Sequence, residues 1–161
     1  GSAIAPLFAP LGWGDWQASV AAITGLVAKE NVVATFGILY GFAEVAEDGL
    51  EIWGTLAASF TVAAAYSFLV FNLLCAPCFA AIGAIKREMN NAKWTIFAVA
   101  YQCVFAYVIA FMIFQFATFF TTGVFGIGLI IALLFLLVML YLLFRSESKK
   151  QVHLEKVKVN A

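Results

Sequence analysis

Long apolar stretches, separated by short polar segments, dominate the pattern of hydrophobic and polar positions along the chain. A transmembrane helix needs about 20 mostly apolar residues, and the stretches that reach this length are predicted to cross a membrane. They cover about residues 16–40, 54–75, 94–119 and 124–144. The pattern therefore predicts an all-α fold, a polytopic membrane helix bundle of about four spans.

The second apolar stretch continues past its predicted span and is too long for one crossing. A single helix over 54–89 would extend about 54 Å at 1.5 Å per residue, whereas the hydrocarbon core is about 30 Å thick. Pro77 resolves the excess, because proline lacks the amide hydrogen of a helical bond and clashes with the preceding turn. We therefore expect a Pro-broken helix near 75–78, followed by a half-helix or interfacial helix over 77–90.

Residues 1–14 precede the first predicted span and are apolar, but proline and glycine interrupt them. Such a broken apolar segment is typical of a re-entrant or interfacial position. Trp13 and Trp16 flank Asp15 close to the start of the span. Because tryptophan is enriched at membrane–water interfaces, we expect both indoles in an aromatic belt.

Charged residues gather between and after the predicted spans. The loop 41–53 carries acidic side chains and no basic one, whereas the segment 86–93 and the tail 145–161 are rich in Lys and Arg. Cytoplasmic loops of membrane proteins carry an excess of Lys and Arg. We therefore predict that residues 15–144 form a multi-pass region in the cell membrane, with a basic cytoplasmic tail and with both ends of the chain in the cytoplasm.

The composition indicates that the lipid bilayer is the main surrounding of the chain. Hydrophobic residues make up 65% of the 161 residues and charged residues 11%, against roughly 45–50% and 25% in soluble domains. The net charge is zero and gives no reason to expect a nucleic-acid partner. The three cysteines are too few for a disulfide framework. The length is small for a complete transporter, so we expect a fragment or one subunit of a larger protein.

Lys29 and Glu30 stand in the middle of the first predicted span, and Asn31 follows them. Each charge at a helix centre costs about 2.5–3.5 kcal/mol on insertion scales. Adjacent residues point about 100° apart on a helix, so either each charge has its own partner elsewhere or one of them stabilises a break in the helix. Intramembrane charges mark substrate or ion pathways, and we predict that Lys29, Glu30 and Asn31 line such a pathway. A buried charge that only fixes helix packing is the alternative.

Cys75, Pro77 and Cys78 form the second candidate group. A thioredoxin-type redox motif would need a βαβ context, which an apolar helix does not provide. A structural zinc site needs four ligands, and the remaining candidates Cys103 and His153 lie on other segments. Two interpretations stay open for the cysteines: small apolar packing residues, or a place along an ion pathway. The second follows because broken backbone at membrane depth is tolerated where it lines a cavity, and because thiol sulfur suits transition metals.

A set of short motifs occurs in a fixed order over about residues 1–118. In chain order they are Ile4–Gly12, Asp15-Trp16, Gly25–Val33, Tyr66–Phe68, Pro77-Cys78 and Arg87-Glu88. This combination resembles the C-terminal membrane region, with its gate segment, of the ferrous iron transport protein B (FeoB) family. The later residues match only in kind.

The resemblance implies the C-terminal transmembrane part of an Fe²⁺ transporter. In the family, the cysteine after the proline is proposed to face the ion path, which corresponds to Cys78. The family's Ala-Lys-Glu corresponds to Ala28, Lys29 and Glu30. The resemblance therefore implies Fe²⁺ as the transported substrate, with Cys78 and Glu30 as transient metal contacts.

The family normally carries an N-terminal GTP-binding domain. This chain has no G-x-x-x-x-G-K-[ST] loop, so we expect no enzymatic activity and no cofactor, with GTP acting only through a domain outside the chain. The expected partners are the lipid bilayer and the rest of the transporter, namely an upstream gate segment and the GTPase domain; a homo-oligomer is left open. The alternative functions are a gate-type transporter of an organic solute such as a nucleoside, and an assembly segment that transports nothing.

Overall fold

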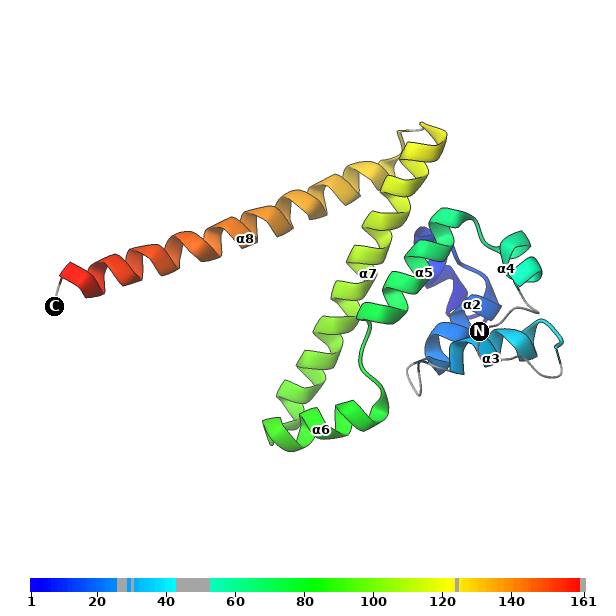
Figure 1. Cartoon of the computed structure of the whole chain (residues 1–161), viewed down its shortest axis with the longest axis horizontal. Helices are drawn as coiled ribbons and strands as arrows, with labels where there is room; N and C mark the ends of the chain where they lie inside the picture. The colour runs from blue at the N-terminus through cyan, green and yellow to red at the C-terminus, as the bar shows by residue number, and fades with distance from the viewer. Residues whose placement is uncertain (26–28, 30, 43–52, 124, 160–161) are drawn as a thin grey trace.

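The computed structural model describes residues 1–25, 29, 31–42, 53–123 and 125–159, with side chains described as far as Arg145. Within these residues every regular element is a helix and no strand occurs (Figure 1), so the predicted all-α class is confirmed. In chain order the elements are α1 (Ala5–Phe8), the 3-10 helix η1 (Ala9–Leu11), α2 (Trp16–Thr24), α3 (Asn31–Leu39), α4 (Trp53–Ser59), α5 (Val62–Leu74), α6 (Phe79–Met89), α7 (Ala92–Thr122) and α8 (Ile127–Val159).

The packing of α5 against α7 forms the centre of the bundle. Ala106 and Ala110 of α7 are fully buried, and small side chains let two helices approach closely. Ser67 of α5 crosses the interface, because its hydroxyl donates to the Ala110 carbonyl at 3.1 Å. Side chains from α2 and α3 and from the N-terminal segment complete the same apolar core.

The N-terminal segment is folded into this core. Phe8 stacks on Trp13 at 4.4 Å between ring centroids, and the Trp13 indole N–H donates to the Ser67 hydroxyl at 3.3 Å. Trp13 is only 1% exposed, whereas Trp16 is 44% exposed. The expectation that both indoles lie in an aromatic belt is therefore wrong for Trp13, because the turn after η1 directs its ring inward. Gly12 makes that turn, with φ +90°.

The break in the second apolar stretch occurs where Pro77 predicted it. Helix α5 ends at Leu74 and α6 begins at Phe79, with extended backbone at Cys75 and Cys78. Figure 1 shows α6 lying across one end of α7, and the two helices are in contact there. This helix exposes its charged residues Lys86, Arg87 and Glu88.

The first predicted span differs from the expectation, because residues 16–40 do not form one helix. They form α2 and α3, which have 9 residues each and are each about 14 Å long at 1.5 Å per residue. Gly25 caps α2 in close contact with α3, since a Cβ on it would lie 2.8 Å from the Val32 side chain. The apolar pattern alone cannot reveal such a break, because both halves remain apolar.

Three segments of the described residues are long and apolar enough to cross a membrane: Val62–Met89, Ala92–Thr122 and Ile127–Arg145. The first of them includes the break at Pro77. The bundle character is thus confirmed, while the crossing expected of residues 16–40 would have to be made by the broken pair α2 and α3.

Helix α8 leaves the bundle at the end of α7 and extends away from it (Figure 1). Leu129 and Ala132 are buried near the junction, whereas Leu137 and Leu142 farther along are exposed. The helix continues to Val159, so the predicted tail prolongs the helix of the predicted span 124–144. An apolar helix without protein cover is typical of a lipid-facing position.

Candidate functional site around the α5 break

The carbonyl of Leu73 lacks a helical partner. In a continuous helix it would accept from the amide of residue 77, but that residue is Pro77, which has no amide hydrogen. The Nζ of Lys29 donates to this oxygen at 3.1 Å. The lysine therefore satisfies the backbone group that the proline leaves without a partner.

This contact brings the middle of residues 16–40 against the break after α5. Lys29, from the first candidate group, therefore lies next to the segment that holds the second candidate group, Cys75, Pro77 and Cys78. Asn31 is the first residue of α3 and is exposed. Glu30 and Ala28 lie outside the described residues. Of the predicted charged pair, only Lys29 can thus be assigned a partner.

Further polar groups surround the break between α2 and α3. The hydroxyls of Thr24 and Thr35 lie 3.1 Å apart and join the two helices. The Asn72 side-chain amide donates to the Phe68 carbonyl at 2.9 Å. Its oxygen faces the end of α2, since a Cβ on Gly25 would lie 3.1 Å from it. Hydroxyl, amide and carbonyl oxygens thus gather where the two broken helices meet.

The three cysteines lie at or opposite the α5 break, and all are free thiols. Cys78 is half-buried and directly precedes α6, whereas Cys75 ends α5 and is buried. The Cys75 thiol donates to the Cys103 sulfur of α7 at 3.7 Å. No sequence pattern signals this pair beyond the place of Cys103 on another predicted span, because the proximity of the two thiols depends on how α5 packs on α7.

The described residues do not assemble a permanent metal centre. No group of three or more His, Cys, Asp or Glu side chains among them is placed to hold a metal ion together. The oxygen and thiol groups near the break could instead offer single contacts to a cation.

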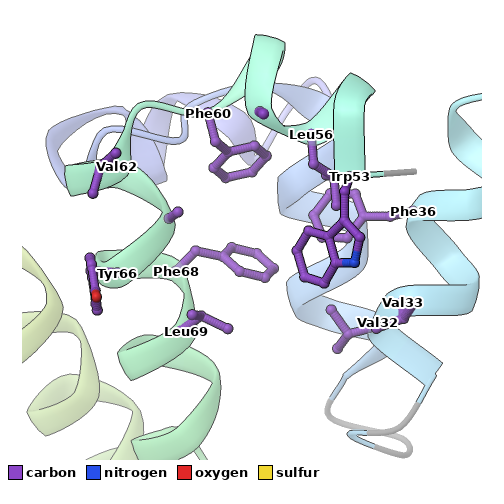
Figure 2. A pocket seen from close by; sticks show the side chains of 12 residues that line it. Val32, Val33, Phe36, Trp53, Leu56, Phe60, Val62, Tyr66, Phe68 and Leu69 are labelled. Carbon is purple, nitrogen blue, oxygen red and sulfur yellow. The ribbon is translucent and has the colours of Figure 1, made fainter. Parts of the chain in front are cut away.

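A separate apolar cavity of about 390 Å³ lies between α3, α4 and α5. Figure 2 shows the rings of Phe60, Phe68 and Trp53 around it. Among the residues that line it, the Tyr66 hydroxyl and the Trp53 indole are the polar side-chain groups. A cation requires oxygen, nitrogen or sulfur ligands, so this cavity is a poor ion site.

A family comparison decides what kind of domain holds this arrangement. Residues 1–92 match the family described as Gate: Nucleoside recognition. The chain belongs to the Gate family. The matched region includes the broken pair α2 and α3, the break between α5 and α6, Lys29 and the cysteines of the α5 break. Cys103 and α8 lie beyond it.

The curated relatives of this chain are named as iron transporters. The Fe(2+) transporter FeoB of Methanocaldococcus jannaschii is 42% identical over 113 residues, which are 70% of this chain and 16% of that protein. The FeoB proteins of Staphylococcus aureus strain COL and Campylobacter jejuni are 39% and 36% identical, over 71% and 70% of this chain and 17% and 18% of their own lengths. The resemblance to the FeoB membrane region is thereby confirmed.

The chain spans only about one sixth of the length of these relatives, 16% to 18%. No solved structure matches the chain.

Proposed function

We propose that this Gate chain is the C-terminal transmembrane part of a ferrous iron transporter and forms part of its ion pathway. The names of the curated relatives support Fe²⁺ as the substrate. In this proposal the lipid bilayer and the rest of the same transporter are the partners, and the chain itself catalyses no reaction. GTP binding belongs to a domain outside the chain, together with the upstream gate segment.

The observation that carries the proposal is the bond from Lys29 to the Leu73 carbonyl. An ammonium group is a tethered cation, and the oxygen that it contacts has no helical amide partner because of Pro77. When Lys29 moves away, this carbonyl is free to contact a mobile cation. Cys78 and Glu30 are the further contacts that we propose along this path, with Asn31 and Cys75 beside them.

The cargo that fits these groups is a transition-metal ion. Thiol sulfur is a soft ligand that suits iron, and carbonyl and carboxylate oxygens also bind divalent metals. A nucleoside would need several hydrogen-bonding side chains for its sugar and base, and the apolar cavity between α3 and α5 offers few. Ferrous iron is therefore the better substrate on chemical grounds.

The test is Fe²⁺ uptake by cells that express the full-length transporter with single substitutions. We expect Cys78→Ser, Glu30→Ala and Lys29→Met each to lower uptake at unchanged membrane abundance. Lys93→Ala is the control, because this exposed lysine lies at the start of α7 and contributes no group to the break. Normal uptake in both the Cys78 and the Glu30 variants would refute the site assignment.

Competition distinguishes the proposed substrate from the alternative. Excess unlabelled Fe²⁺ should abolish the uptake of radioactive iron, and an excess of nucleoside should not affect it. Uptake of labelled nucleoside that depends on the same residues would support the solute transporter instead.

The proposed topology places both ends of the chain in the cytoplasm. The basic residues near α6 and in the tail support it. Labelling of a cysteine or tag at residue 161 in intact cells tests this topology. If a reagent outside the cell labels residue 161, the proposed orientation is wrong.

A further inference from the structure

Among the described residues, the closest contact between two thiols joins Cys75 and Cys103. The proposed ion pathway does not require this contact. The two sulfur atoms lie 3.7 Å apart. The two residues come from different helices, so their contact joins the α5 break to the middle of α7. We propose that Cys75 and Cys103 form an oxidative modification site, in which hydrogen peroxide converts the two thiols into a disulfide that ties the break to α7.

The geometry permits the bond after a small movement. A disulfide requires about 2.05 Å between sulfur atoms, so the two sulfurs must approach by roughly 1.7 Å. Cys75 stands in extended backbone, with φ −60° and ψ 167°, directly after the last turn of α5. Cys103 stands inside a helix of 31 residues. The non-helical segment that follows α5 can thus make the adjustment while α7 stays in place.

The exposure of the two residues suggests the order of the chemistry. Cys103 is half-buried, whereas Cys75 is 7% exposed. The thiolate of Cys103 attacks one peroxide oxygen, the O–O bond breaks, and a sulfenic acid and hydroxide form. The Cys75 thiol then attacks this sulfur, the S–O bond breaks, and the leaving hydroxide takes the thiol proton. In sum, two thiols and one hydrogen peroxide give one disulfide and two waters.

The cross-link acts on the segment that carries the proposed pathway. Residues 75–78 connect α5 to α6 and contain Pro77 and Cys78. With Cys75 bonded to α7, this segment can no longer move relative to the bundle. We expect that Fe²⁺ uptake falls in proportion to the cross-linked fraction and returns after reduction, a consequence that rests on the proposed function.

The cross-link itself can be tested without transport. Membranes that contain the full-length transporter are treated with hydrogen peroxide, free thiols are alkylated, and the digest is analysed by mass spectrometry. We expect a peptide pair linked through Cys75 and Cys103, which dithiothreitol separates. The pair should be absent in Cys75→Ser and in Cys103→Ser, and it should persist in the matched control Cys78→Ser.

The outcomes separate this proposal from the proposed function. Peroxide treatment that oxidises Cys103 without any linked peptide, or that links Cys78 in place of Cys75, would overturn the modification site. This outcome is read from the wild-type transporter, so it does not depend on whether a variant folds. A linked peptide with unchanged uptake would overturn the restraint on the pathway. An untreated transporter that takes up no iron would refute the proposed function alone, since peptide mapping still reports whether the disulfide forms.

Discussion

Lys29 and Pro77 act on the same backbone oxygen. The effects of substituting them on the local stability of the α5 end should therefore not be additive. The Lys29 ammonium donates to the Leu73 carbonyl at 3.1 Å, and this carbonyl is free because Pro77 has no amide hydrogen. The variant Pro77→Ala supplies that hydrogen and lets the segment after α5 continue the helix. In that background the amide of residue 77 competes with the lysine for the oxygen.

The size of the effect follows from the kind of bond that is lost. Hydrogen bonds to charged groups contribute about 1.5–3 kcal/mol, and the exposed position of Lys29 argues for the lower end. Lys29→Met removes the ammonium and keeps the length of the stem, so it should cost about 1.5 kcal/mol in the wild type. In Pro77→Ala the carbonyl keeps a backbone partner, and the cost should fall to about 0.5 kcal/mol. The expected coupling of about 1 kcal/mol lies within the range for residues that share a partner.

Local hydrogen exchange measures this difference directly. The Cys75 amide, which donates to the Phe71 carbonyl at 2.8 Å, reports the last turn of α5. A free-energy change of 1.4 kcal/mol is a tenfold change in the opening equilibrium. Lys29→Met should thus accelerate exchange of this amide about tenfold in the wild type, and only about twofold in Pro77→Ala. Lys93→Ala, at the start of α7, should leave it unchanged.

Equal acceleration in the two backgrounds would refute this account. It would mean that Lys29 acts through its charge on the surroundings, and that its bond to the Leu73 carbonyl is incidental. No acceleration in either background would show that the break is stable without the lysine.

Two further predictions concern the packing that holds the break in place. Ser67→Ala leaves the buried indole N–H of Trp13 without an acceptor. Thermal unfolding of the full-length transporter in detergent should therefore reveal a loss of stability of about 1–3 kcal/mol. The control Ser59→Ala, at an exposed serine, should change stability by less than about 0.5 kcal/mol, and equal losses in the two variants would contradict the reasoning. Gly12→Ala places a Cβ at φ +90° against a ring of α7 and should cost about 1–3 kcal/mol. Gly54→Ala, where nothing lies within 4 Å, is its control, and an unaffected Gly12 variant would show that the N-terminal segment yields freely.

The break after α5 could be predicted because it depends on a covalent property of one residue. Proline removes a helical hydrogen bond wherever it stands in a helix interior, so Pro77 predicts the end of α5 without knowledge of the neighbouring helices. The confirmed membrane-bundle class likewise follows from composition and from the length of the apolar stretches. These features are local, and a single sequence contains them.

The division of residues 16–40 and the Cys75–Cys103 contact could not be predicted in this way. A continuous and a broken apolar helix have the same hydrophobic pattern, and one glycine at residue 25 is a weak signal. The cysteine contact depends on the register of α5 against α7, which involves residues 28 positions apart in the chain. Trp13 is a third example, since its burial results from the turn at Gly12 and not from its place next to a predicted span.

The way in which polar side chains are satisfied supports the α5 break as the place for a cation. Ser19 and Thr95 are buried, and each hydroxyl donates to the carbonyl of the residue four positions earlier. Ser67 likewise donates to a carbonyl inside α7. These carbonyls belong to regular helical turns, so the hydroxyls add a second bond to oxygens that already have an amide partner. Lys29 instead reaches across the chain to the one oxygen that Pro77 frees. A positive charge thus lies where the backbone offers an oxygen without a helical partner, as a passing cation would require.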